Sequence, residues 1–248
     1  MYSSRSAPPP LHHAPRGFSG NPNLHSRLLE PADEPLWTAL RNEVIAALPD
    51  PDCYVREHDE RAFFLQHCTP WGETIGVFHG DALVAYAMLG LPAVDDPENL
   101  GVRLKLDASG RAATAHLSSC MVRPGWRGQG LQRTLLGARL ALAHAHQRHL
   151  CMAVVSLHNH SSRHNMLRRG LHVAWVGDLD GLRRQIALID LHHGLHVDTG
   201  DERLIDSDDL AAQQQAFADG YVGVGELRTD DQVHLRFLRR LVIQGVPL

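Results

Sequence analysis

The stretch that most constrains the fold of this chain is VRPGWRGQGLQ, which spans residues 122–132. An apolar run, residues 115–122, precedes it, and a run with helical periodicity, residues 131–147, follows it. This order predicts a strand, a glycine-rich turn and the start of a helix. Glycines at 125, 128 and 130 let a ligand approach the backbone closely. The turn is therefore expected to present N–H groups at a helix N-terminus, where phosphate oxygens bind.

Two common phosphate-binding motifs do not fit this turn. A P-loop has Lys and then Ser or Thr after its final glycine, whereas Leu131 and Gln132 follow Gly130. A dinucleotide-binding fingerprint has a third glycine three residues after the second, and Arg133 stands at that place. A nucleotide-binding protein with another phosphate ligand is therefore the least favoured interpretation.

The turn instead resembles the pyrophosphate loop of the GNAT acetyltransferases. Their pattern is Arg or Gln, two residues, glycine, one residue, and then glycine or alanine. The residues that fit it are Arg127, Gly128, Gln129, Gly130 and Leu131. Gln132 departs from the pattern at the last position, although its N–H is still expected to be available. The resemblance implies that residues 127–132 hold the pyrophosphate of acetyl-CoA and that Arg127 contacts a phosphate, while Arg123 and Arg133 flank the turn.

A second segment resembles the next block of the same superfamily. Asn159 and Ser162 follow an apolar run at residues 150–157, and Gly170 with Leu171 closes the short helix expected between them. The resemblance implies that Asn159 caps this helix and contacts the pantetheine arm of the cofactor, with Ser162 beside it. It covers residues 25–191 and implies an α/β (mixed α+β) fold with a mainly antiparallel sheet and helices on both faces.

Hydrophobic patterning along the chain predicts the same order of elements. The expected strands are residues 26–29, 74–78, 82–91, 115–122, 150–157, 171–176 and 185–191. The expected helices are residues 31–48, 55–67, 131–147 and a short one after Asn159. Residues 92–111 are expected to form a polar loop, and residues 1–24, rich in Ser, Pro, Gly and His, a disordered or peripheral tail.

Residues 192–248 are additional to this pattern and are expected to be an extension packed on, or continuous with, the main domain. A helix is expected from Ser207 to Phe217, and three glycines at 220, 223 and 225 interrupt the chain after it. Residues 233–242 are apolar and Arg-rich and fit either a strand or a helix. The extension is interpreted either as a cover for a sheet edge or as a wall of the substrate pocket.

Composition argues against several classes of function. The formal net charge of −4 and the sequence pI near 6.5 do not favour a nucleic-acid partner. The N-terminal residues lack a hydrophobic signal core, and no apolar run approaches the ~20 residues of a membrane helix, so a cytoplasmic protein is expected. The four cysteines have no paired metal spacing, and Cys120 and Cys151 are expected to be buried, reduced thiols.

Acetyl transfer to an amine requires a held thioester, a deprotonated amine and stabilisation of the oxyanion. The resemblance places the carbonyl and the pantetheine against Met121 and Val122. His116 lies six residues before Val122, where some family members have a catalytic Glu, and is the candidate base. An unperturbed imidazole titrates near pH ~6.5, which suits this role. The alternative is a strand histidine that faces solvent.

The general acid is less evident than the base. Family members often use a Tyr in the helix after the Asn to protonate the departing thiolate, and Met166 stands at that position. Ser161, Ser162 or His164 are the alternative donors, with Ser162 retained as a weak candidate. Unassisted departure is also open, because a free thiol has a pKa of about 8.5.

A nucleophilic cysteine and a metal centre are both disfavoured. Cys120, like Ser118 and Ser119, lies in an apolar run with no base evident beside it, so structural roles are expected. Two histidine clusters lack an accompanying carboxylate or Cys motif and are interpreted as polar surfaces; they are His158, His160 and His164, and His192, His193 and His196. No metal is expected.

The sequence therefore predicts an acyl-CoA-dependent N-acyltransferase that uses acetyl-CoA and transfers the acyl group to a primary amine by direct attack in a ternary complex. The alternative is a non-catalytic acyl-CoA-binding regulatory module, which Met166, Gln132 and the C-terminal extension favour slightly. A small-molecule amine is preferred over a peptide or protein acceptor. No nucleic-acid or membrane partner is expected, and a homo-oligomer is compatible with the sequence.

Overall fold

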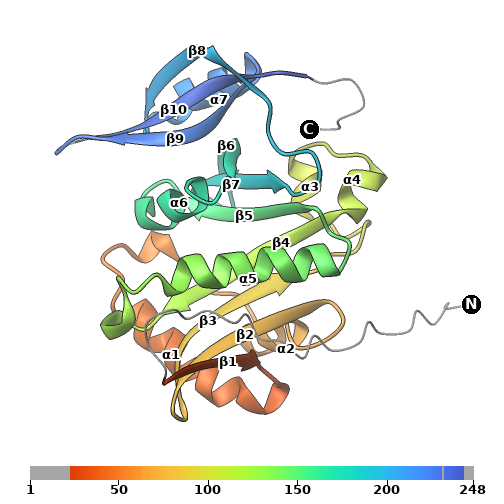
Figure 1. Ribbon diagram of the computed structural model, residues 1–248, viewed down its shortest axis with the longest axis vertical. Helices are drawn as coiled ribbons and strands as arrows, with labels where there is room; N and C mark the ends of the chain where they lie inside the picture. Colours follow the sequence, from red (N-terminus) through yellow and green to blue (C-terminus); the bar gives the residue numbers. More distant parts are fainter. Residues whose placement is uncertain (1–22, 231, 243–248) are drawn as a thin grey trace, which may run out of the picture.

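The computed structural model describes residues 23–230 and 232–242, so nearly all of the expected tail lies outside the described residues. One ten-stranded sheet runs through the chain in the order β1-β2-β3-β4-β5-β7-β6-β9-β10-β8 (Figure 1). The strands are β1 (Leu24–Leu28), β2 (Gly72–His79), β3 (Ala82–Gly90), β4 (Thr114–Val122), β5 (Leu150–Ser156), β6 (His172–Leu179), β7 (Leu182–Asp190), β8 (Val197–Asp206), β9 (Tyr221–Arg228) and β10 (Val233–Arg240). Only β4 and β5 pair in parallel among the described strands, which confirms the mixed, mainly antiparallel sheet.

Helices cover both faces of the sheet, as the alternation of side chains in β3 shows. Ala85, Ala87 and Leu89 point towards α5 (Leu131–Ala145) on one face. Tyr86 and Met88 point to the other face, where they pack with α1 (Glu34–Ala46) and α2 (Glu60–Gln66). Short α3 (Leu100–Arg103) and α4 (Ala108–Ala112) lie beside β5 and β7, and α6 (His160–Leu167) lies beside α5.

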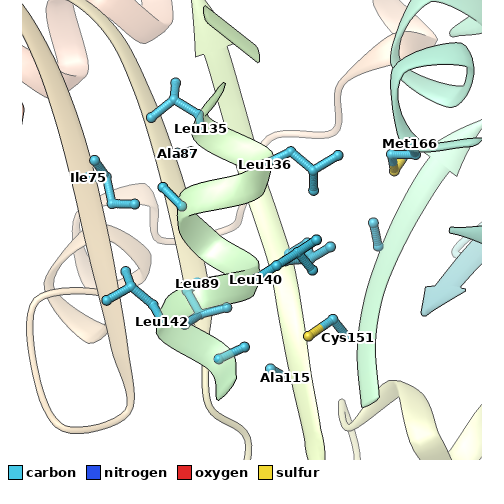
Figure 2. Packing of buried hydrophobic residues seen from close by; sticks show 14 of the residues in the cluster. Ile75, Ala87, Leu89, Ala115, Leu135, Leu136, Leu140, Leu142, Cys151 and Met166 are labelled. Atoms are coloured by element: carbon cyan, nitrogen blue, oxygen red, sulfur yellow. The ribbon is translucent and has the colours of Figure 1, made fainter. Parts of the chain in front are cut away.

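The main helix α5 follows the predicted apolar stripe. Leu131, Leu135, Leu136 and Leu142 are all less than 9% exposed, and they pack on β2, β3 and β4. Figure 2 shows Leu135 and Leu142 at opposite ends of the helical segment, near Ile75, Ala87 and Leu89, with Met166 and Cys151 on the β5 side. This packing fixes the axis of α5 across the sheet and so fixes where its N-terminus lies.

The structure corrects the expected loop at residues 92–111, which holds the short helices α3 and α4. Their N-caps are Asn99 and Asp107, whose side chains accept hydrogen bonds from the N–H groups of Gly101 and Gly110. The helix expected over residues 55–67 begins later, at Glu60, because Asp59 is its N-cap. The other predicted strands and helices of the main domain are present, with ends that differ by a few residues.

The C-terminal extension is a β-α-β-β unit that continues the sheet. It contains two strands, β8 and β9, that patterning did not predict, the expected helix as α7 (Leu210–Ala218), and β10 as a strand. A single registered pair, Val173 with Gly223, joins β9 to β6. The extension has its own small core around Leu235 and Phe237, and it lies uppermost in Figure 1.

Buried polar contacts attach the extension to the main domain. Arg163 of α6 is fully buried, and its Nε donates to Glu226 of β9 at 2.7 Å. Gln185 of β7 donates to the side chain of Gln213 of α7 at 2.6 Å. These contacts tie the extension to α6 and β7. None of the helices in the described ranges is long and apolar enough to cross a membrane.

Candidate functional site

The parallel pairing of β4 with β5 ends early and opens the sheet. The last registered pair joins His116 to Met152, while β4 continues to Val122 and β5 to Ser156. A cavity of about 600 Å³ lies at this opening. Residues from α5 and α6 line it on one face of the sheet, and residues from α2 and the loop after β3 line it on the other. A molecule in the cavity can therefore reach from one face to the other.

A β-bulge in β4 determines which groups meet this cavity. The register between β3 and β4 shifts by one residue between Ala87 and Leu89, so β4 carries an extra residue there. As a result Ser118 and Ser119 both direct their hydroxyls to the face that α1 and α2 cover. The Ser118 hydroxyl lies 3.1 Å from His67 Nε2, and the Ser119 hydroxyl lies 3.0 Å from the Tyr86 hydroxyl.

The backbone of β4 beyond the bulge also presents donors to the opening. The N–H of Arg123 donates to the carbonyl of Val84 at 2.9 Å, and Met121 is in register with Tyr86. Hydrogen bonding alternates along an antiparallel pair, so the N–H groups of Cys120 and Val122 point away from β3. The sequence indicates Met121 and Val122 for contact with the carbonyl and the pantetheine. The N–H of Val122 is directed to the opening, whereas the N–H of Met121 is directed to β3.

The glycine-rich turn leaves the first amides of α5 uncapped. Gly128 and Gly130 have φ of +78° and +76°, a region that favours glycine. Gly130 is the N-cap of α5 and supplies no side-chain hydrogen bond. The N–H groups of Leu131 and Gln132 are consequently free to bind a ligand, although the Leu131 side chain is buried in the core. Arg127 lies exposed just before this turn.

Gln132, which departs from the family pattern, links α5 to α6. Its Nε2 donates to the Ser162 hydroxyl at 3.3 Å, and its Oε1 accepts from Asn165 at 2.6 Å. The Asn159 side chain accepts from the N–H of Ser162 at 3.1 Å, which confirms the expected cap. All of these residues line the cavity, so Gln132 narrows the space between the helices without blocking the N-terminus of α5.

A second hollow, of about 710 Å³, runs along the outer side of α5 from Gln129 and Gly130. Its walls include the guanidinium groups of Arg133, Arg168 and Arg169, all on exposed residues. The hollow begins at the uncapped amides and carries several positive charges, so it suits a ligand with more than one phosphate.

His67 of the α2 C-terminus is a functional candidate that the sequence did not indicate. It is 5% exposed, and its Nδ1 lies 2.8 Å from the carbonyl oxygen of Phe63. Because a carbonyl only accepts, Nδ1 carries the proton and Nε2 has a lone pair for the Ser118 hydroxyl. Burial lowers the pKa of His67, so the ring is neutral at pH 7.

His116, the base suggested by the sequence, lies beside this pair but is engaged differently. Its Nε2 accepts the N–H of Leu100 at 3.0 Å and so caps the start of α3. Burial lowers the pKa of His116 to about 4. It does not face solvent, and its lone pair is occupied, which favours a positioning role over proton transfer.

Arg139 of α5 places a buried positive charge at the bulge. It is 5% exposed, and its Nη1 donates to the carbonyl oxygens of Ser118 at 3.1 Å and Met88 at 3.4 Å. Burial lowers the pKa of Arg139, and no carboxylate among the described residues forms an ion pair with it. The guanidinium therefore stabilises carbonyls left unpaired by the bulge and makes this end of the cavity positive.

The other sequence candidates occupy the walls. Met166 is 6% exposed and packs in the core below α5, and its thioether carries no proton to donate. The thiols are free; Cys151 is fully buried as expected, whereas Cys120 is partly exposed and lines the cavity. On the face that α2 and the loop after β3 cover, the lining includes Glu57, Asp96 and Glu98. Desolvation and the carboxylates of Glu98 and Glu60 raise the pKa of Glu57.

Comparisons with known proteins agree with this architecture. The yncA protein of Salmonella typhimurium, solved with acetyl-CoA, matches with a TM-score of 0.51 at 19% identity, covering 71% of this chain and 99% of that one. A ribosomal-protein-alanine N-acetyltransferase from Brucella melitensis matches at 0.52 and 19%, covering 67% and 99%. The PaiA N-acetyltransferase of Thermoplasma acidophilum, in complex with coenzyme A, matches at 0.50 and 16%, covering 67% and 98%. At these identities the likeness shows a shared fold.

The class of protein follows from a sequence comparison. The model of the acetyltransferase (GNAT) family matches residues 29–171, which contain the opening, the turn and the Asn159 block. The chain therefore belongs to the GNAT acetyltransferase family, whose acyl donor is acetyl-CoA. No curated protein sequence matches the chain.

Proposed function

We propose that the chain transfers an acetyl group from acetyl-CoA to a primary amine of a small cationic acceptor. The observation that carries this proposal is the opening between β4 and β5, which joins the uncapped N-terminus of α5 to the Ser118–His67 pair. Acetyl-CoA enters from the α5 side with its pyrophosphate on the amides after Gly130. Its 3′-phosphate lies near Arg168 and Arg169, and its pantetheine arm passes Asn159.

The amine approaches from the opposite face, loses its ammonium proton to solvent, and attacks the thioester carbon directly as the neutral amine. Its nitrogen forms the new C–N bond, and its proton passes to the Ser118 hydroxyl as that hydroxyl gives its own proton to His67 Nε2. The N–H groups of Cys120 and Val122 stabilise the oxyanion. The C–S bond then breaks, and the CoA thiolate leaves and takes up a proton from solvent, since Met166 cannot supply one.

The acceptor is assigned to the cationic class because of the charges that line its face of the cavity. Glu57, Asp96 and Glu98 carry the carboxylates there. Opposite charges attract a protonated amine and raise its local concentration near the opening. A polyamine or another small amine with a second positive charge is therefore expected to react with a higher kcat/KM than a neutral amine.

Calorimetric titration with acetyl-CoA, CoA and ATP tests the donor site. Gly130→Asp introduces a side chain and a negative charge at a positive-φ N-cap, and it should abolish acetyl-CoA binding. Gly125→Ala is the matched control, because a Cβ there meets nothing within 4 Å and the φ of Gly125 is not positive. Wild-type protein that binds no CoA would refute the donor-site assignment.

Thiol release with a panel of amines tests the chemistry. Ser118→Ala and His67→Gln are each expected to lower kcat by roughly 100-fold or more, with the Kd for acetyl-CoA unchanged. Ser119→Ala, which removes a hydroxyl bonded to Tyr86, is the matched control and should lose much less activity. Acetyl-CoA binding with no turnover on any amine would support the alternative of a non-catalytic acyl-CoA-binding module.

A further inference from the structure

A group of metal-ligating side chains lies at the edge of the sheet where β5 begins and β7 ends. Asp190 ends β7, His149 immediately precedes β5, and His193 lies in the turn that leaves β7. One ligand atom from each lies within 4.8 Å of the others. Asp190 lies three residues before His193 in the sequence, whereas His149 joins them only through the pairing of β5 with β7.

The carboxylate of Asp190 is positioned before any ligand binds. It is 4% exposed, and its Oδ1 accepts the backbone N–H groups of His192 at 2.9 Å and His193 at 3.2 Å. The two flanking imidazoles also form hydrogen bonds to this carboxylate. Such second contacts orient a ligating carboxylate in metal sites.

The imidazoles of His149 and His193 both contact this carboxylate through Nδ1. His149 Nδ1 lies 3.0 Å from Asp190 Oδ1, and His193 Nδ1 lies 2.9 Å from Asp190 Oδ2. A tetrahedral zinc ion with bonds of about 2.0–2.2 Å keeps its ligand atoms roughly 3.4 Å apart. Small shifts of these side chains would therefore let one cation replace the two protons that now bridge the nitrogens and the carboxylate.

We propose that His149, Asp190 and His193 form a binding site for one divalent transition-metal ion, most simply Zn²⁺. Two imidazoles and one carboxylate are a ligand set that suits zinc, whereas magnesium and calcium prefer oxygen ligands. His193 is exposed, so water can complete the coordination. The ring of His192 stacks on that of His149 at 4.2 Å and covers one side of the site.

The site is separate from the acetyl-transfer chemistry. His149, Asp190 and His193 are not among the residues that line the cavity, which β5 meets from Met152 onward. Figure 1 shows the chain passing from the end of β7 to β8 of the extension. A bound ion would thus fasten the turn that begins the extension to the start of β5. The role of the bound ion is structural, and the proposal of this metal site does not rest on the proposed acyltransferase function.

Zinc titration of the full chain, stripped with a chelator and exchanged into metal-free buffer, tests the proposal. Calorimetry should detect one tight site per chain. Zinc at about 100 times its Kd should raise Tm by roughly 5–10 °C. His193→Ala, a change at an exposed side chain, should weaken zinc binding by at least about 100-fold, and His149→Ala should do the same.

His196→Ala is the matched control, since its ring contacts the carbonyl of His193 and is not in the ligand set. It removes one histidine from the same turn and should leave both the Kd and the Tm shift unchanged. Circular dichroism confirms that each variant is folded. If wild type and all three variants bind zinc alike, scattered surface histidines account for the binding and the proposed site is rejected. Failure to bind zinc stoichiometrically in the wild type rejects it as well.

Discussion

A fall in pH from 7 to 5 is expected to destabilise the fold through His172, the first residue of β6. This side chain is 5% exposed, and its Nδ1 is buried without a hydrogen-bond partner. Burial, aided by the charge of Arg240, lowers its pKa from 6.5 to about 4. The unfolded chain consequently takes up a proton at pH 5 that the folded chain does not bind.

Proton linkage gives the sign and the size of this change in the free energy of unfolding. With a folded pKa below the unfolded one, the stabilising contribution is complete above the unfolded pKa of 6.5 and is lost as pH falls towards the folded pKa of about 4. Between pH 7 and pH 5 this one group should lower the free energy of unfolding by about 2 kcal/mol. That loss is a large fraction of the stability of an ordinary domain.

Urea denaturation of wild type and His172→Leu at pH 7 and pH 5 isolates this contribution. The leucine variant differs from wild type at pH 7 by a packing term that does not depend on pH. Its loss of stability between the two pH values should be smaller than that of wild type by about 2 kcal/mol. Equal losses in the two proteins would refute the argument, because His172 would then have the same pKa folded and unfolded.

Three other changes test packing and ligand contacts. The buried ion pair between Arg163 and Glu226 can be tested with Arg163→Met, Glu226→Gln and the double variant. Urea denaturation should give a coupling free energy between the two residues of about 3 kcal/mol. Additive losses of stability in the double variant would contradict this coupling. Gln132→Ala should lower the free energy of unfolding by about 1 kcal/mol, measured by thermal denaturation, because it removes the link from α5 to α6. Arg169→Ala should weaken CoA binding roughly tenfold in calorimetry with kcat unaltered, and an unchanged Kd would place the 3′-phosphate elsewhere.

The turn and the helix that follow β4 were predictable because their signals are local. A few neighbouring residues determine each of these features. They are the positive-φ glycines, the uncapped N-terminus at Gly130 and the cap at Asn159. The caps of α3 and α4 are equally local, and Asn99 and Asp107 were available as signals for them. The expected polar loop was wrong because two of its polar residues, Asn99 and Asp107, cap short helices.

The Ser118–His67 pair could not be predicted from spacing. The two residues lie 51 positions apart, and they meet only because a bulge turns the hydroxyl of Ser118 towards α2. An extra residue in a strand leaves no periodic signal in a segment as apolar as β4. Arg139, by contrast, has a signal in the sequence, because it is a charged residue on the buried side of α5 between Leu135 and Leu142. The strand β9 was missed because the glycines at 223 and 225 indicated a break.

One irregularity in β4 brings together most of the groups to which we assign the proposed chemistry. The extra residue places the hydroxyls of Ser118 and Ser119 on one face, and it leaves backbone carbonyls for Arg139 to bind. The pairing of β4 with β5 has already ended at Met152, so the N–H groups of β4 that point away from β3 beyond the bulge have no strand to pair with. A small residue is also required opposite, since a Cβ on Gly90 would lie 3.3 Å from both His67 and Ser118. The proposed donor site is therefore fixed by local sequence, whereas the proposed acceptor chemistry depends on this bulge and on the strands that hold it.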